Sequence, residues 1–324
     1  MANIDFLRER ALLLRKLRHW FDGRGFFEVH PPCLSGDCVV DTYIEPIAVE
    51  TAELGLGAVD LAERLFLQTS PELAMKRMLA AGAPSIYALV PVFRGGEYGP
   101  LHNVEFTMLE WYEVGGNYES ARNLTGKLAC DILEIPTYES LSYQDAFQQL
   151  ADCDPLADST DRLRERAIHC APDLEDGAGH PHVCVDRDAF LDVILSYQVA
   201  PQLGKTKPTI LFDYPITQAA LAKTSARDDR CAARFELFID GVEIANGYDE
   251  LLDAEELERR TSEHQTARQT LGKRTLPGNP SLIKSMRTGL PACSGVALGV
   301  DRLLMLSVGR QSVQDVLPFT TASA

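Results

Sequence analysis

Residues 92–112 read V-F-R-G-G-E-Y-G-P-L-H-N-V-E-F-T-M-L-E-W-Y, and the expected fold rests first on these residues. It predicts two antiparallel strands joined by a polar loop, at residues 85–93 and 105–112, the first of which ends on Arg94. Side chains two positions apart in a strand point to the same face of a sheet. The second strand therefore carries one face of aromatic, apolar and acidic side chains, which are Phe106, Met108, Glu110 and Tyr112.

These residue types suit a bound nucleotide and a cationic substrate. The planar guanidinium of Arg94 can bind a phosphate through two parallel hydrogen bonds. The ring of Phe106 offers a flat face to adenine, and the carboxylate of Glu110 can pair with an ammonium group. Taken alone, the stretch is equally consistent with a solvated hairpin that has a half-buried aromatic face, because such hairpins are common.

A second motif lies near the C-terminus, where residues 294–305 read S-G-V-A-L-G-V-D-R-L-L-M. The pattern predicts a strand, a glycine turn and an amphipathic helix, with Gly295 and Gly299 allowing close approach of the backbone. Arg302 falls in the first turn of that helix, where the helix dipole favours anions. A strand-to-helix turn without a ligand is the alternative explanation of this motif taken alone.

A third motif, at residues 235–251, predicts a hairpin whose two-residue turn is the Asp-Gly pair at 240–241. That turn pairs Phe238 with Glu243, so Glu236 and Glu243 become diagonal neighbours on one face. Two anions so close repel each other unless a cation lies between them. Carboxylate oxygens suit Mg²⁺, which binds through one or two carboxylates together with substrate phosphates. A solvent-facing acidic strand is the alternative.

The rest of the chain favours an α+β architecture, with antiparallel strands packed beside helices rather than an alternating parallel fold. Ser70 and Pro71 predict the start of a helix over residues 73–81, as N-cap and first helical residue. Residues 139–200 have helical periodicity and predict an insertion, interrupted by a Gly/His/Pro break at 177–182. The further expected elements are a basic amphipathic helix at 6–22, helices at 117–135 and 254–271, and a strand at 209–214.

Composition narrows the class of protein. The 324 residues are 45% hydrophobic, which is enough for a large globular core, and no run is long enough to span a membrane. The N-terminus lacks the pattern of a secretory signal, and the eight cysteines form no CxxC pair, so we expect a reduced, cytoplasmic setting. A net charge of −16 disfavours broad attraction to nucleic acid.

Together the motifs carry a family resemblance. The pattern F-R-x-x-E…H-N-x-E-F-T-M-L-E-W-Y resembles motif 2 of class II aminoacyl-tRNA synthetases, specifically the lysyl branch. Residues 294–305 are similar to motif 3, and residues 6–32 to motif 1, which forms the dimer interface and ends at Pro32. The resemblance implies one catalytic domain over residues 1–324, in which an antiparallel sheet is flanked by helices, with the insertion at about 139–200.

The resemblance also implies roles for individual residues. Arg94 and Arg302 are the expected catalytic residues, because they would neutralise the α- and γ-phosphates of ATP. Mg²⁺ is expected on Glu236 and Glu243. The expected substrate-binding residues are Ser70, Glu72, Glu110, Tyr112, Asn246, Glu250 and Ala297. The expected ATP-binding residues are Arg94, Glu97, His102, Asn103, Phe106, Glu243, Ile244, Gly299 and Arg302.

Within the lysyl branch, the chain resembles the truncated paralogues that ligate (R)-β-lysine to elongation factor P. Only five residues precede the first expected helix, so no N-terminal anticodon-binding domain is expected. Ala297 stands where the synthetases favour glycine, and its extra methyl group is expected to favour a β-amino acid over α-lysine. The sequence departs from the family at Gly95-Gly96, which is expected to alter ATP affinity.

The expected activity is ATP-dependent activation of (R)-β-lysine, or lysine, and its transfer to a lysine ε-amino group of elongation factor P. The expected assembly is a homodimer formed through the N-terminal helix and the Pro32 region, with no membrane partner and tRNA not expected as the acceptor. Two alternatives remain open: a lysyl-tRNA synthetase-like enzyme that acts on tRNA, and a catalytically silent regulatory paralogue.

Overall fold

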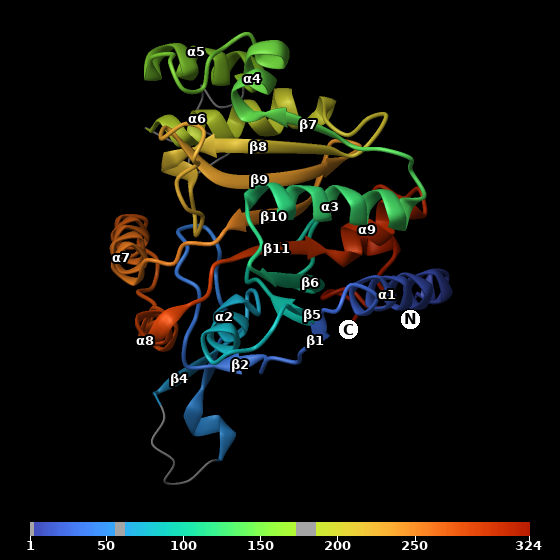
Figure 1. The fold of residues 1–324 in the computed structure, drawn as a ribbon, viewed down its shortest axis with the longest axis vertical. Helices are drawn as coiled ribbons and strands as arrows, with labels where there is room; N and C mark the ends of the chain where they lie inside the picture. The colour runs from blue at the N-terminus through green and yellow to red at the C-terminus, as the bar shows by residue number, and fades with distance from the viewer. Residues whose placement is uncertain (1–2, 56–61, 173–185) are drawn as a thin grey trace. The chain divides into compact units, whose positions relative to one another are not determined.

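The computed structural model describes residues 3–55, 62–172 and 186–324 (Figure 1). The chain forms two compact units. Unit 1 comprises Met1–Asn117 and Glu250–Ala324. Unit 2 comprises Tyr118–Asp249. Each unit contains strands with flanking helices of its own.

The main strands of unit 1 follow the order β1-β5-β6-β11. The β5–β6 and β6–β11 pairs are antiparallel, whereas β1 lies parallel to β5. The hairpin expected from residues 92–112 is confirmed, and its second strand continues to Val114. The bounds of these strands are β1 (Phe27–Glu28), β5 (Ile86–Phe93), β6 (Glu105–Val114) and β11 (Cys293–Gly299).

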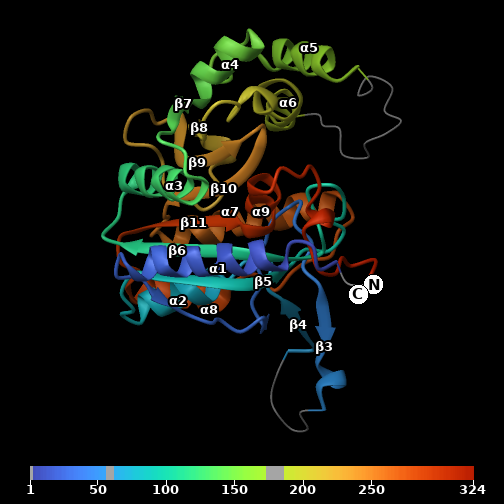
Figure 2. The same ribbon diagram turned by 90° about the vertical axis from the view of Figure 1, so that its right-hand side faces the viewer.

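One face of this sheet packs on the N-terminal helix α1 (Leu7–Asp22), which lies along the strands in Figure 2. Phe21 of α1 stacks on Tyr87 of β5 with 4.9 Å between ring centroids, and lies 5.2 Å from the ring of Trp111 of β6. All three side chains are buried, so this aromatic group anchors α1. Because side chains alternate in a strand, the opposite face of β6 presents Phe106, Met108, Glu110 and Tyr112.

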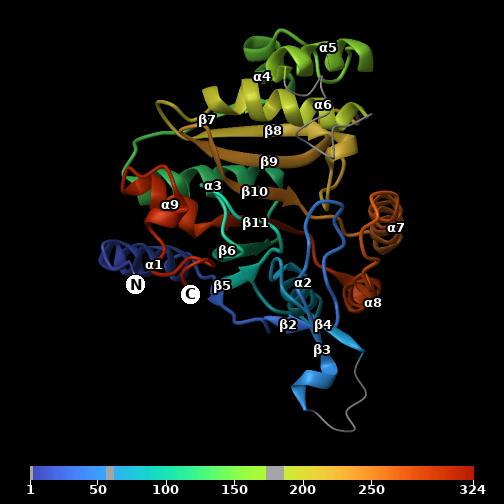
Figure 3. The same ribbon diagram turned by 180° about the vertical axis from the view of Figure 1, so that it is seen from behind.

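The remaining elements of unit 1 surround this sheet. The helices α7 and α8 lie side by side, and α8 also packs on α2 (Figure 3). A small sheet has the strand order β2-β4-β3. The bounds are β2 (Leu34–Ser35), β3 (Ala48–Glu50), η1 (Thr51–Leu54), β4 (Arg64–Leu67), α2 (Glu72–Ala80), α7 (Ala254–Thr270), α8 (Pro280–Gly289), α9 (Val300–Ser307) and η6 (Val313–Asp315).

The strands of unit 2 follow the order β10-β9-β8-β7. The β9–β10 hairpin turns at Asp240 and Gly241, which both have positive φ values, of 51° and 80°. An Asp-Gly pair is the usual choice for such a turn, and the expected hairpin is therefore confirmed. The bounds are β7 (Glu139–Ser142), β8 (Thr209–Pro215), β9 (Cys231–Ile239) and β10 (Val242–Asp249).

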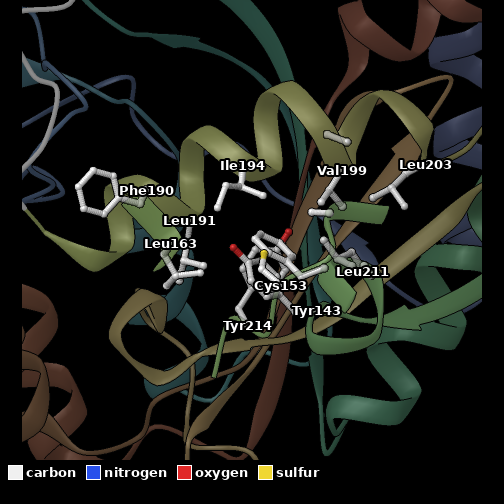
Figure 4. Packing of buried hydrophobic residues seen from close by; sticks show 14 of the residues in the cluster. Tyr143, Cys153, Leu163, Phe190, Leu191, Ile194, Val199, Leu203, Leu211 and Tyr214 are labelled. Atoms are coloured by element: carbon white, nitrogen blue, oxygen red, sulfur yellow. The ribbon is translucent and has the colours of Figure 1, made fainter. Parts of the chain in front are cut away.

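Helices cover the strands of unit 2. Several begin at side chains that accept a hydrogen bond from the first helical turn, namely Ser142, Ser159 and Asp186. In Figure 4, Tyr143 and Tyr214 lie at the centre of a buried apolar cluster drawn from α4, α5, α6 and β8. The bounds are α3 (Tyr118–Leu133), α4 (Tyr143–Ala151), α5 (Thr160–Cys170), α6 (Arg187–Ile194), η3 (Leu195–Val199), η4 (Ala200–Gln202) and η5 (Ile216–Gln218).

Two details differ from the sequence-based expectations. The region expected to be helical from residue 139 begins instead with strand β7, which pairs parallel to β8. The strands are also not purely antiparallel, because β1–β5 and β7–β8 are parallel pairs. The expected break at 177–182 and Cys184 lie outside the described residues. The prediction of one catalytic domain with an insertion at about 139–200 stays a prediction.

Two other expectations concern cysteines and the membrane. The seven cysteines among the described residues are all free thiols, as expected. Across residues 3–55, 62–172 and 186–324, no helix combines the length and apolar character that crossing a bilayer requires.

Candidate functional site

The site-bearing face of unit 1 is built by β6 and β11. The register places Ala297 opposite Glu110 and Gly295 opposite Tyr112, so these side chains share one face. The methyl group of Ala297 therefore lies on the same face as the carboxylate of Glu110. At the other end of β6, Phe106 lies four residues from Glu110, which is about 13 Å along a strand.

The Phe106 end of this face is aromatic and cationic. The guanidinium carbon of Arg94 lies 5.3 Å from the centroid of the Phe106 ring. Its Nε donates to the carbonyl oxygen of Thr69 at 3.3 Å, and a guanidinium nitrogen lies 3.8 Å from a carboxylate oxygen of Glu97. Arg94 is thus placed over the ring that the sequence assigned to adenine.

Arg302, in the first turn of α9, is oriented by the loop that follows β5. Its Nε donates to the carbonyl oxygen of Leu101 at 3.1 Å, and its Nη2 lies 2.7 Å from Nε2 of His102. Because arginine only donates, Nε2 of His102 accepts in this contact. Burial, with a further contribution from Arg302, lowers the pKa of His102.

Sequence reasoning did not identify what holds α9 in place. Asp301, next to Arg302, accepts hydrogen bonds from Arg10 of α1 and from the backbone N–H of Thr107. Arg10 also donates to Oγ1 of Thr107 at 2.6 Å. Arg10 was grouped by sequence with the basic residues of the N-terminal helix, but here it links α1, β6 and α9 within the protein.

Asn103 has a structural role in the same loop. Its Nδ2 donates to the carbonyl oxygen of Glu105, and its Oδ1 accepts from both the backbone N–H and the hydroxyl of Thr321. The side chain therefore ties the loop to the C-terminal segment. Its expected contact with ATP stays a prediction.

The other end of the face is acidic and buried. Glu110 accepts hydrogen bonds from the hydroxyl of Ser70 and from that of Tyr112, each at 2.7 Å. Burial, followed by repulsion from Glu72, raises the pKa of Glu110 to about 8. Ser70 also accepts from the backbone N–H of Glu72 at 3.0 Å, but helix α2 begins at Glu72 with Pro71 as its N-cap. The prediction of Ser70 as N-cap and Pro71 as the first helical residue is therefore wrong by one position, because Ser70 caps only the residue at which the helix starts.

A lysine that sequence reasoning did not place in the site lies among these acids. Nζ of Lys76 lies 2.5 Å from an oxygen of Glu72 and 2.5 Å from an oxygen of Glu250. Its side chain is 3% exposed, and its ammonium lies 5.9 Å from the ring centroid of Tyr112. The Glu72–Lys76 spacing of four residues on a helix was a signal of an ion pair. The contact with Glu250 could not be seen in the sequence, because the two residues are far apart along the chain.

Gly295 provides the space for this acidic group. A Cβ atom built on Gly295 would lie 2.1 Å from Oε1 of Glu250 and 2.5 Å from Cε1 of Tyr112. The close approach expected for Gly295 is therefore confirmed. A Cβ atom on Gly299 would instead meet Cδ of Arg302 at 3.8 Å, which is an ordinary contact.

In unit 2, the expected carboxylates lie on the β9–β10 hairpin. The predicted pairing of Phe238 with Glu243 is confirmed, but a β-bulge between Glu243 and Ala245 then places Asn246 opposite Glu236. Ile244 falls within this bulge. The bulge was not visible in the sequence, because it depends on how the two strands pair.

Glu236 is buried and firmly held. It accepts hydrogen bonds from Tyr214 at 2.5 Å and from Arg234 at 2.6 Å. Burial, followed by repulsion from Glu243, raises the pKa of Glu236. Oδ1 of Asn246 is buried and has no hydrogen-bond partner in the described part of the chain. Within those same residues, no group of three or more His, Cys, Asp or Glu side chains is arranged to hold a metal.

Comparison with known proteins shows the family of the chain. A family described as tRNA synthetases class II (D, K and N) matches residues 2–323. Because the match covers nearly the whole chain, the protein belongs to this family. Its relatives include proteins named elongation factor P–(R)-β-lysine ligase from Salmonella paratyphi B and Salmonella heidelberg. Each is 41% identical over 323 residues, which cover 100% of this chain and 97% of the relative.

Proposed function

We propose that this protein is an ATP-dependent ligase that activates (R)-β-lysine, or lysine, and transfers it to a lysine ε-amino group of elongation factor P. The observation that carries the proposal is the divided face of β6. Arg94 and Phe106 at one end suit a nucleotide, and the buried acids around Glu110 at the other end suit an ammonium group. The names of the relatives support the acceptor protein and the amino acid.

In the first step, a carboxylate oxygen of the amino acid attacks the α-phosphorus of ATP. A new P–O bond forms, the bond to the β-phosphate oxygen breaks, and pyrophosphate leaves. Arg94 stabilises charge at the α-phosphate, and Arg302 binds the γ-phosphate, so catalysis rests on positioning and charge stabilisation. Glu97, His102, Asn103 and Gly299 border the ATP site.

In the second step, the ε-amino group of the acceptor lysine attacks the carbonyl carbon of the adenylate. An amide bond forms, AMP leaves, and the nitrogen loses a proton to solvent. Glu72 holds the backbone ammonium of the substrate, while Glu110, Tyr112 and Glu250 hold its side-chain ammonium. The hydroxyl of Ser70 keeps Glu110 in place through the hydrogen bond at 2.7 Å.

Mg²⁺ belongs to the proposal as the cation for Glu236 and Glu243. The donor set fits, because both groups offer hard oxygen ligands and the repulsion between them would be relieved by a divalent cation. A carboxylate can accept from Arg234 and Tyr214 and still ligate a metal through its remaining lone pairs. The buried Oδ1 of Asn246 is a further oxygen opposite Glu236. When bound, the metal would supply positive charge to the phosphates of ATP.

Ala297 is proposed to tune the choice of amino acid. Its methyl group shares a face with Glu110, where a glycine would leave space for the amine of an α-amino acid. Filling that space favours a substrate whose amine sits one carbon further from the carboxylate. We further propose a homodimer formed through α1 and the Pro32 segment, and a cytoplasmic location alongside elongation factor P.

The experiment is the intact mass of elongation factor P after incubation with this protein, ATP, Mg²⁺ and (R)-β-lysine. Parallel reactions replace (R)-β-lysine with α-lysine, or add tRNA as a competing acceptor. The expected result is a single β-lysyl addition to the factor, with tRNA uncharged. An Arg302→Ala variant serves as the matched inactive control.

Two results would contradict the proposal. Charged tRNA beside an unmodified factor would favour the tRNA-acting alternative. A failure to consume ATP with any amino acid would favour a silent regulatory paralogue. The dimer is tested separately by sedimentation of the full chain, where a monomer at micromolar concentration would contradict it.

A further inference from the structure

The acidic end of the site contains a cation supplied by the protein itself. Lys76 is buried, with 3% of its side chain exposed, and its ammonium lies 2.5 Å from both Glu72 and Glu250. These are two of the carboxylates that the proposed function assigns to the substrate. A buried ion pair contributes little net stability compared with an apolar replacement, so stability alone does not account for this lysine.

The charges of this group can be counted. The carboxylates of Glu72, Glu110 and Glu250 all interact with Tyr112, and Glu72 also repels Glu110. Lys76 supplies a positive charge to this group through its contacts with Glu72 and Glu250. Three carboxylates and one ammonium leave two net negative charges when all are ionised. A lysine or β-lysine substrate carries two ammonium groups, whereas an ordinary neutral amino acid carries one.

We propose that Lys76 is the fixed counter-cation of the amino-acid site, offsetting one of three carboxylate charges so that the two remaining charges match a substrate with two ammonium groups. The inference rests on the proposed function for the identity of the substrate. It makes Lys76 a specificity-determining residue that acts through Glu72 and Glu250, rather than a group that reacts.

The physical reason is the cost of burying uncompensated charge. Carboxylates taken out of water without a cation hold protons instead of remaining ionised. Although burial alone would lower the pKa of Lys76, Glu250 and Glu72 raise it above its ordinary value, so the lysine stays charged. Lys76 in turn lowers the pKa of Glu110, against the larger effects of burial and Glu72. Without Lys76, the site would have to release an additional proton before it could bind a second ammonium group.

The test is calorimetry of (R)-β-lysine and L-lysine binding to the full-length protein between pH 7 and pH 9, in buffers of different ionisation enthalpy. L-norleucine, which lacks the terminal ammonium, is the third ligand. Lys76→Met removes the charge and keeps the chain length, and Lys76→Arg keeps the charge. Lys127→Met is the matched control, because Lys127 also pairs with an acid four residues away but is 60% exposed.

The wild type is expected to prefer lysine over norleucine. At pH 7, Lys76→Met is expected to bind lysine about tenfold more weakly for each unit by which a carboxylate pKa rises above the assay pH. It should also release more protons per lysine bound and recover affinity toward pH 9. Lys76→Arg should keep the proton count of the wild type, and Lys127→Met should be unchanged.

Different failures have different meanings. A wild type that binds neither lysine nor (R)-β-lysine would overturn the proposed function, and the inference with it. Lysine binding by the wild type, with equal proton release in Lys76→Met, would overturn the inference alone. So would an affinity loss that is the same at every pH, because that is the mark of a purely structural lysine. Lys76→Gln, whose amide still donates a hydrogen bond, is the second neutral variant if Lys76→Met does not fold.

Discussion

Gly295 lies against Glu250 so closely that a Cβ atom on the glycine would be 2.1 Å from a carboxylate oxygen. The glycine belongs to β11, and the carboxylate follows the end of the β9–β10 hairpin in the sequence. Lack of a side chain at this one position therefore lets the acid reach Lys76. The sequence motif by itself indicates only a strand and a turn. In the folded protein, a residue without a side chain is a steric requirement at position 295.

Gly295→Ala is expected to weaken lysine binding and to destabilise the protein by about 1–3 kcal/mol, because the new methyl group overlaps Glu250 and Tyr112. Thermal unfolding and calorimetry of lysine binding measure the two effects. Gly299→Ala, in the same strand, is the control for stability, since its Cβ would make only ordinary contacts with the side chain of Arg302, the nearest at 3.8 Å. An equal loss of stability in both variants would contradict the steric explanation.

Glu110 is expected to make the unliganded protein less stable as pH rises. Its pKa in the folded protein, about 8, lies above the ordinary 4.5, so the folded state favours the protonated acid. The stability that the protonated carboxyl of Glu110 contributes to the folded state is fully present below pH 4.5. It is lost progressively as pH rises to about 8. Urea unfolding at pH 5, 6.5 and 8 should show a decline of a few kcal/mol that is smaller in Glu110→Gln. The same decline in both proteins would refute the assignment.

Arg302→Ala is expected to reduce adenylate formation by about 100-fold or more, because it removes a preorganised positive charge from the phosphates. Pyrophosphate exchange measures this step without the acceptor protein. The same variant should raise the pKa of His102, because Arg302 contributes to lowering it. An NMR titration of the histidine reports that shift. Full activity in the variant would show that the phosphate contact is irrelevant.

Arg268→Met is expected to destabilise unit 1 and to weaken ATP binding. Arg268 is fully buried and donates to the carboxylate of Glu45 at 2.9 Å and to two backbone carbonyl groups of the same loop. The carbonyl of Glu45 in turn accepts from the N–H of Gly95 at 2.7 Å, beside Arg94. We expect a loss of roughly 2–3 kcal/mol, because Glu45 keeps partial access to water.

The matched control for Arg268 lies on the same helix. Arg259 also forms ion pairs with acids three and four residues away, but 57% of its side chain is exposed. Arg259→Met is therefore expected to change stability by less than about 0.5 kcal/mol. Denaturant unfolding and the Michaelis constant for ATP are measured for both variants. An equally small effect of Arg268→Met would contradict the proposal that Arg268 holds the loop whose Glu45 carbonyl group accepts from Gly95.

Local sequence patterns were enough to predict the main strands and turns and the faces that they present. The alternation along β6 placed Phe106 and Glu110 on one face, and the Asp-Gly pair fixed the β9–β10 turn. These predictions succeeded because side-chain periodicity and turn chemistry depend on neighbouring residues. The family resemblance supplied the roles of the arginines and acids, which no local pattern could assign.

Which charged side chains contact one another depends on the packing of the folded chain. The contact of Lys76 with Glu250 and the link from Arg10 to Asp301 join segments far apart in the chain. The bulge that sets Asn246 opposite Glu236 lies within one hairpin but depends on how its two strands pair. Burial then determines whether these groups stay ionised, because a carboxylate without water is stabilised only by the partners that the fold places next to it. A sequence can show that such residues are present, but packing determines which of them are paired and how strongly their pKa values shift.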